Sequence, residues 1–330
     1  MDSLIFAFEK VCPLIIMVVV GYYLKKVGLM SGEFAKMANK LVFRVFLPIK
    51  LFLNVYGIKS LSTVNFGYII YSLVALLILF GLAIPTVIFL TDKKKCRGAL
   101  LQGIFRSNYA LIGIPIASDL LNLGNEGAAA ATLLSAFIVP AFNMLAVIGL
   151  SIFNNDGEKA NIKKVLLGIA KNPLILSIAA GLCALGVRAI FIECDISFRL
   201  SEITYVFKPM NDLGNVATPL ALLVLGAQFE FATIPSLKRE IFTGVILRSA
   251  VVPVLAVGTA YLCFRNSFSG AHFASLVAAF CTPVAVSSVP MAQEMGADVE
   301  LAGQLVVFTT ITSAFTIFVA SFLLRAAGIF

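Results

Sequence analysis

Two stretches of the sequence place prolines and polar side chains in the middle of apolar segments. They read GIFRSNYALIGIPIASDLL at residues 103–121 and AAFCTPVAVSSVPMAQEMG at residues 278–296. Proline lacks a backbone N–H and clashes with the preceding helical turn, so we expect each segment to break near its middle, around 108–114 and 283–289. Broken backbone inside a bilayer is tolerated only where it is buried in protein or lines a wet cavity. The chemistry that such breaks offer is the binding of small ions.

The helix ends at these breaks would present opposite partial charges. Pro115 and Pro290 suit the first position of a new half-helix, which would cover 115–123 and 290–296. The N-terminus of each half-helix offers free N–H groups to an anion, and the C-terminal end of the preceding half offers carbonyl groups to a cation or a proton. We therefore expect an anionic ligand with a co-transported cation. The alternative is that the prolines merely kink two core helices.

Polar side chains near the breaks are the candidates for ligand contact. The Asn108 amide can donate and accept, which suits a carboxylate, and it could equally cap the broken helix. Arg106 could pair with an anion or bond the carbonyl groups at the break, and both roles stay open. Ser287 and Ser288 could contact the ligand or bond their own backbone. The predicted substrate-binding residues are Asn108, Tyr109, Arg106, Gly113, Thr282, Ser287 and Ser288, and the predicted breaks are at Pro115, Pro283 and Pro290.

Two carboxylates occupy equivalent places in the two stretches. Asp119 and Glu294 each follow a break proline, Pro115 or Pro290, by four residues, which is about 6 Å along a helix. A carboxylate at that depth in a membrane is a functional candidate by default. We therefore predict that both residues couple transport to protons. The alternative is that each side chain reaches the headgroup region at the end of its helix.

The composition indicates what kind of chain positions these residues. Of the 330 residues, 60% are hydrophobic and 13% are charged, with a mean hydropathy of +1.00. A soluble domain has about 45–50% apolar and about 25% charged residues, which excludes an ordinary cytosolic enzyme, a disordered chain and a disulfide scaffold. No Walker loop, HExxH or GxSxG motif is present. We therefore expect no enzyme activity, no cofactor, no metal site and no nucleic-acid partner.

The length fits roughly ten membrane spans at ~20 residues each plus loops. An all-α integral membrane protein with ten transmembrane helices is therefore predicted, in which the fourth and ninth helices are the broken ones that cross. The expected spans are 4–24, 34–56, 65–90, 98–123, 127–152, 165–190, 202–228, 240–263, 271–294 and 300–325.

The chain also repeats itself weakly. PLIIMVVVG at 13–21 matches PLILSIAAG at 173–181, and the segments at 107–117 and 282–292 match at an offset of 175 residues. The predicted halves are 1–152 and 165–330, separated by a short cytoplasmic linker at 153–164. Each half holds five spans, an odd number, so the second half must enter the membrane from the opposite side. This 5+5 inverted repeat is typical of many secondary transporters.

Positive charge predicts the orientation of the chain. The loops after the first, third, fifth and seventh spans carry more lysine and arginine than the opposite side, so we expect them to be cytoplasmic and both termini to be extracytoplasmic. Arg248, in the eighth span, is expected to extend to the cytoplasmic surface. The second span carries a polar stripe, predicted to lie at the cytoplasmic mouth or at an interface, which consists of Lys36, Lys40, Arg44 and Lys50.

These motifs resemble those of the auxin efflux carrier family. SNYALIGIPIA at 107–117 fits its N-x-x-x-x-G-I-P pattern. TPVAVSSVPMAQE at 282–294, NPLIL at 172–176 and ATPLALLVLGA at 217–227 look like its bacterial members. The resemblance covers nearly the whole chain. The ninth span begins its break with Thr282–Pro283 and lacks a second asparagine, so the two halves of the site are unequal.

The resemblance implies a fold similar to that of the bile acid/sodium symporters. Spans 1, 2, 6 and 7 would form a scaffold domain that often makes a homodimer contact, and spans 3–5 and 8–10 would form a transport domain. Transport would be elevator-like, with the residue at the position of Asn108 contacting the substrate carboxylate. The implied function is secondary active transport of small mono- or dicarboxylates across the cell membrane, coupled to protons or uncoupled, with membrane lipid as the surroundings.

Two other functions stay open. One is a sodium-coupled carrier of larger amphipathic acids, as in the bile acid symporter relatives. The other is a channel or a sensor that does not transport. The pairing of prolines across an inverted repeat favours a carrier over both.

Overall fold

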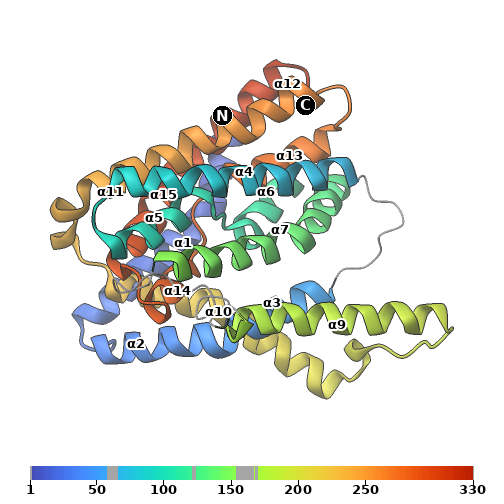
Figure 1. Ribbon diagram of the computed structural model, residues 1–330, viewed down its shortest axis with the longest axis horizontal. Helices are drawn as coiled ribbons and strands as arrows, with labels where there is room; N and C mark the ends of the chain where they lie inside the picture. The colour runs from blue at the N-terminus through green and yellow to red at the C-terminus, as the bar shows by residue number, and fades with distance from the viewer. Residues whose placement is uncertain (1, 58–65, 121–123, 154–166, 168–169, 330) are drawn as a thin grey trace.

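The described part of the chain is helical. The computed structural model describes residues 2–57, 66–120, 124–153, 167 and 170–329 (Figure 1). These residues form α-helices, short π-helical and 3-10 turns and loops, and they contain no β-strand. A chain that crosses a membrane has to pair its backbone groups within helices or in a closed barrel. The all-α prediction is confirmed.

The first half begins with a long helix. α1 (Asp2–Lys26) is followed by a second span that consists of α2 (Gly32–Leu41), the π-helical turn η1 (Val42–Phe46) and α3 (Leu47–Tyr56). Ser31 caps α2, because its side chain accepts a hydrogen bond from Phe34 N. The remaining elements of this half are α4 (Phe66–Leu90), α5 (Lys94–Phe105), the π-helical turn η2 (Tyr109–Gly113), α6 (Ile114–Asp119) and α7 (Gly124–Phe153).

The second half begins with α9 (Pro173–Glu193), which Asn172 caps by accepting a hydrogen bond from Leu174 N. The next elements are η4 (Leu200–Glu202), α10 (Thr204–Gln228), η5 (Phe231–Thr233), α11 (Ile234–Ile246), the π-helical turns η6 (Leu247–Val251) and η7 (Val254–Gly258), and α12 (Thr259–Phe264). The chain then forms α13 (Gly270–Phe280), α14 (Ser288–Glu294) and α15 (Val299–Ala326).

Five helices of the described chain are long and apolar enough to cross a membrane. They are Phe66–Leu90, Ala130–Phe153, Pro173–Glu193, Phe231–Phe264 and Val299–Ala326. Their outer faces expose large apolar side chains, such as Phe89, Leu262 and Phe315. Apolar surface on this scale would be unfavourable in water and is suited to lipid. The helices are those of a multi-pass membrane protein.

The helices pack in two groups (Figure 1). α2, α3, α9 and α10 lie along one side of the molecule, where α3 packs against α9 and α10, and α1 packs against α10. α4, α5, α7, α11, α13 and α15 pack on one another along the other side. α1 also contacts α15, and α14 contacts α2 and η1, so these elements lie where the two groups meet.

Both predicted breaks are present, a few residues before their expected positions. α5 ends at Phe105, and the next helical segment begins at Tyr109 rather than at Pro115, because the π-helical turn η2 leads directly into α6. α13 ends at Phe280 and α14 begins at Ser288, so Pro290 is in the first turn but is not the first residue. A first-turn N–H has no intrahelical partner to lose.

α1 and α10 approach each other closely at two glycines. A Cβ atom added at Gly21 would lie 2.0 Å from Leu223 O, and one at Gly226 would lie 1.9 Å from Val18 O. In both cases the obstacle is backbone, which cannot move aside as a side chain would. Small residues that let two backbones meet are typical of helix contacts in membranes.

Replacing Gly226 by alanine is therefore expected to destabilise the protein strongly. The added methyl group overlaps the backbone of α1, and overpacking of this kind costs about 3 kcal/mol. Thermal unfolding of the purified protein in detergent measures the effect. Gly81→Ala is the matched control, because a Cβ at Gly81 in α4 meets nothing within 4 Å. Equal unfolding midpoints for the two variants would contradict the close contact.

Candidate functional site

The two chain breaks touch each other. The Ser107 and Thr282 hydroxyl groups are 2.6 Å apart, and these residues are separated by 175 positions. Asn108 N donates to Pro283 O at 2.8 Å, and this pair has the same separation in the chain (283 − 108 = 175). This separation equals the offset at which the sequence repeats. Segments that the repeat makes equivalent therefore meet at one point in the structure.

A cavity of about 70 Å³ adjoins this meeting point. Both breaks contribute to its wall, and so do α3 and α10 from one helix group and α7 from the other. Its lining residues are Leu47, Lys50, Leu51, Asn54, Arg106, Ser107, Asn108, Tyr109, Val139, Phe142, Asn143, Ala217, Thr218, Ala221, Ala285, Val286 and Ser287. The cavity therefore lies between the two helix groups.

Arg106 is the central charge of this site. Its side chain is 1% exposed, and Nη1 donates to Gln102 Oε1 at 2.7 Å and to Ser288 Oγ at 3.3 Å. Nη2 donates to Asn143 Oδ1 at 2.6 Å and to Ser287 Oγ at 2.7 Å. Of the two roles left open for Arg106, the geometry does not support bonding of the carbonyl groups at the break. These neutral side-chain acceptors orient the guanidinium group but leave its charge unbalanced.

Lys50 adds a second positive charge to the same wall. Its Nζ atom lies 3.4 Å from Thr218 Oγ1, and both residues line the cavity. Within the part of the chain that the structure describes, no carboxylate lies within ion-pair distance of Lys50 or Arg106. Asn108 Nδ2 is buried and has no hydrogen-bond partner, which costs about 1–3 kcal/mol when no acceptor is supplied. The site is electropositive and has a spare donor.

The first turn of α14 does not offer the free N–H groups expected of it. Ser288 N donates to Ala285 O at 2.9 Å, and Val289 N donates to Val286 O at 3.2 Å. Pro290, the expected first residue, has no N–H group, and Met291 N donates to Ser287 O at 3.3 Å. On the α14 side of the cavity, recognition of an anion therefore depends on side chains.

Other predicted site residues contribute to packing. Tyr109 lines the cavity, but its hydroxyl group contacts Ala131 O at 2.9 Å and Ser275 Oγ at 2.8 Å. Gly113 is outside the lining, and a Cβ there would lie 2.9 Å from Ala278 O, so its small size lets η2 approach α13. Thr282 and Ser288 lie behind the wall and bond Ser107 and Arg106.

Of the two predicted proton-coupling residues, Glu294 is outside this cavity lining. Glu294 Oε2 accepts a hydrogen bond from Arg44 Nε at 3.0 Å, where α14 meets η1. Asp119 is the last residue of α6, and its side chain lies outside the described residues, as does that of Pro115.

The position expected for Arg248 is wrong. Its side chain is 1% exposed and does not reach the surface. Nε and Nη2 donate to Thr282 O at 2.9 and 2.6 Å, and Nη1 lies 3.4 Å from Phe105 O. The carbonyl groups at the ends of two interrupted helices lack intrahelical partners. They hold the guanidinium group inside the protein.

Sequence reasoning missed Lys50 and Asn143 as site residues. Lys50 was assigned only to a polar stripe, and Asn143 was not singled out. Each stands alone as a strongly polar residue in an apolar run, LPIKLFL or VPAFNMLAV. A polar residue inside a membrane span is a functional candidate in its own right, and this signal would have found both.

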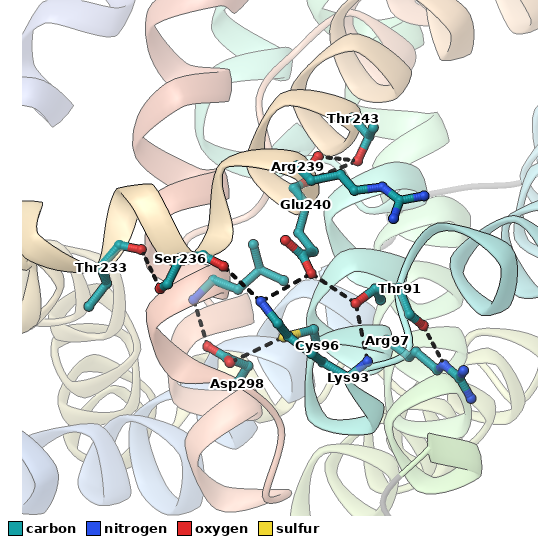
Figure 2. A network of polar contacts seen from close by, with 11 residues as sticks. Thr91, Lys93, Cys96, Arg97, Thr233, Ser236, Arg239, Glu240, Thr243 and Asp298 are labelled. Atoms are coloured by element: carbon teal, nitrogen blue, oxygen red, sulfur yellow. Dashed lines mark hydrogen bonds and ion pairs between the residues drawn. The ribbon is translucent and has the colours of Figure 1, made fainter.

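A second polar cluster joins the start of α5, the first turns of α11 and the start of α15 (Figure 2). Lys93 Nζ lies 3.4 Å from Glu240 Oε1 and 2.7 Å from Ser236 O, and Thr91 Oγ1 donates to Glu240 Oε1 at 2.9 Å. Cys96 Sγ donates to Asp298 Oδ2 at 3.3 Å. Charges of both signs satisfy one another here. The cluster therefore ties α5, α11 and α15 together.

Loss of the Thr282 hydroxyl group is expected to destabilise the meeting point of the breaks. Thr282→Val leaves the buried Ser107 hydroxyl without its 2.6 Å partner, which costs about 1–3 kcal/mol. Thermal unfolding in detergent measures the loss. Thr86→Val is the control, since the exposed Thr86 hydroxyl bonds only Leu82 O of its own helix. If both variants unfold at the same temperature, the hydroxyl pair contributes nothing to stability.

Comparison with known proteins identifies the family of this chain. A model of the family described as membrane transport protein matches residues 6–321. The chain is 25% identical over 244 residues to an uncharacterised transporter of Methanocaldococcus jannaschii, covering 72% of this chain and 73% of that protein. It is 22% identical over 324 residues to an uncharacterised transporter of Methanothermobacter thermautotrophicus, covering 92% of this chain and 94% of that protein. The chain therefore belongs to the membrane transport protein family, the auxin efflux carrier family that its motifs resemble, and is a membrane transporter.

Proposed function

We propose that the protein is a secondary active transporter of small organic anions. The observation that carries this proposal is the cavity in which Arg106 and Lys50 lie without a described carboxylate partner and Asn108 has an unpaired amide N–H. A buried charge is costly unless it is paired. A substrate carboxylate would balance the positive charge and accept the hydrogen bond from Asn108.

The cavity volume favours a small substrate. A water molecule takes up about 10–15 Å³ of such a volume. The cavity of about 70 Å³ therefore holds on the order of five waters, which is comparable to a mono- or dicarboxylate of a few carbon atoms. A larger amphipathic acid would require the two helix groups to separate. This favours the small-anion carrier over the sodium-coupled carrier of larger acids.

The division of the cavity wall supports alternating access of the elevator type. Arg106, Asn108 and Asn143 belong to one helix group, and Lys50 and Thr218 belong to the other. In the proposed ten-span inverted repeat, α1, α2–α3, α9 and α10 are the scaffold domain, and the other helices are the transport domain. Sliding of one group against the other would separate the two cations and weaken their joint hold on an anion. A channel or a sensor has no need of such a divided wall.

Location and assembly follow the same proposal. The segments joined in Figure 2 include 91–97 and 235–240, which the charge pattern assigns to the cytoplasmic side. Their contact supports an orientation in the cell membrane with both termini extracytoplasmic. The exposed apolar face of α9, which includes Leu176, Leu182 and Ile190, supports a homodimer through the scaffold domain, with membrane lipid around the rest.

Uptake into proteoliposomes tests the function. We expect saturable uptake of labelled malonate, malate or lactate in sodium-free buffer, and none of indole acetate. Asn108→Ala removes a hydrogen bond to a charged group, worth about 1.5–3 kcal/mol, so uptake affinity should fall about tenfold or more. Asn211→Ala is the control, because Asn211 bonds only Phe207 O of its own helix. Unchanged affinity in Asn108→Ala would remove this cavity as the substrate site.

Proton coupling is tested with the two predicted carboxylates. An inward proton gradient is expected to accelerate uptake by the wild type. The acceleration should disappear in Asp119→Asn or in Glu294→Gln, whose side chains can no longer carry a proton, and persist in Glu33→Gln, an exposed acid of α2. Initial uptake rates with and without the gradient measure this. Wild-type uptake that ignores the gradient would establish uncoupled transport instead.

A further inference from the structure

Arg248 lies where the helices that precede the two breaks both end. Nε and Nη2 donate to Thr282 O at 2.9 and 2.6 Å, and Nη2 lies 3.5 Å from Ala279 O. Nη1 lies 3.4 and 3.5 Å from Phe105 O and Ile104 O. One guanidinium group therefore contacts the carbonyl ends of α5 and α13, although these helices belong to different halves of the chain.

The charges at this point cancel. The C-terminal end of a helix carries roughly half a negative charge, so two such ends together present about one. The guanidinium group supplies one positive charge. Among the described residues no carboxylate lies within ion-pair distance of Arg248, so its balancing charge comes from the helix ends. Because the side chain is 1% exposed, water screens these charges little.

In transporters with broken helices, unwound carbonyl groups and half-helix C-terminal ends coordinate the coupling cation. Here Arg248 already bonds these carbonyl groups. We propose that Arg248 is a tethered counter-cation, which occupies the place of a co-transported alkali-metal ion, so that the breaks are assembled without sodium. One consequence, transport that does not require sodium, rests on the proposed carrier function. The claim that Arg248 replaces a bound cation at the breaks does not rest on it.

Arg248 acts as a positioning residue through the second break. It is outside the cavity lining and bonds Thr282 O. The Thr282 hydroxyl contacts Ser107, and the adjacent Pro283 O accepts from Asn108 N. The position of Asn108 therefore depends on the carbonyl group that Arg248 holds.

Thermal unfolding in detergent tests, without any substrate, whether Arg248 takes the place of a bound cation. We expect the wild type to have the same midpoint in sodium chloride as in choline chloride. The midpoint of Arg248→Ala should be lower by several degrees and should recover partly when sodium or non-denaturing guanidinium fills the vacated place. Arg239→Ala, which removes an exposed guanidinium from the same continuous helix, should respond to neither cation.

Specific stabilisation of the wild type by sodium would overturn the proposal. So would an Arg248→Ala protein that is as stable as Arg239→Ala and equally insensitive to added cations. If Arg248→Ala cannot be purified in folded form, the unfolding midpoint of Arg248→Lys and the wild-type salt comparison test the proposal instead. Lysine keeps the charge but not the planar fork of donors, so the Arg248→Lys protein should fold but unfold at a lower temperature than the wild type.

Uptake of labelled malonate tests the consequence. We expect equal initial rates for the wild type in sodium, potassium and choline salts, loss of most uptake in Arg248→Ala, and partial recovery when guanidinium is added. Strict dependence of wild-type uptake on sodium would overturn the role of Arg248 and leave the carrier function standing. Absence of wild-type malonate uptake in every salt would instead count against the proposed function, and the unfolding experiments would then decide the role of Arg248.

Discussion

The structure depends on one constraint, which is that backbone groups inside a membrane must find partners within the protein. Each chain break exposes donors and acceptors that an intact helix would have paired. The breaks satisfy one another through Asn108 N and Pro283 O. Val284 N finds a further acceptor in Thr309 Oγ1 at 3.1 Å. Each break therefore supplies part of the pairing that the other needs, and Thr309 and Arg248 supply further partners.

Two buried arginines and the partly exposed Lys50 have different roles around this junction. Arg248 bonds backbone carbonyl groups and adds no polar group to the cavity wall. Arg106 bonds side chains and faces the cavity, and Lys50 faces it from the other helix group. Polar residues inside a membrane are costly and persist where they serve structure or function. Arg248 neutralises the helix ends, and this leaves the other two charges available to a ligand.

The sequence predicts where the two chain breaks lie better than it predicts which side chains surround them. Prolines at 115, 283 and 290 locate the breaks to within a few residues because proline acts on its own local backbone. The sequence carries no signal for the π-helical turn η2. The sequence does not reveal the buried position of Arg248, because its partners are the ends of helices that only the fold brings to it. Lys50 and Asn143 reach the cavity from α3 and α7, and their distance in sequence from the breaks concealed this.

The contacts within and between the two helix groups differ in kind. Inside one group, Gly21 and Gly226 let the α1 and α10 backbones meet. This is a packing contact, and water cannot substitute for it as it can for a hydrogen-bond partner. Where α14 meets α2, η1 and α10, polar contacts join the groups: Asn39 Nδ2 and Gln228 Nε2 donate to Gln293 Oε1 at 3.0 and 3.3 Å, and Arg44 pairs with Glu294. A hydrogen bond that is exchanged for water loses only about 0.5–1.5 kcal/mol net. Polar contacts of this kind can be exchanged for water as one group moves past the other, which is what the proposed elevator movement requires at this part of the boundary.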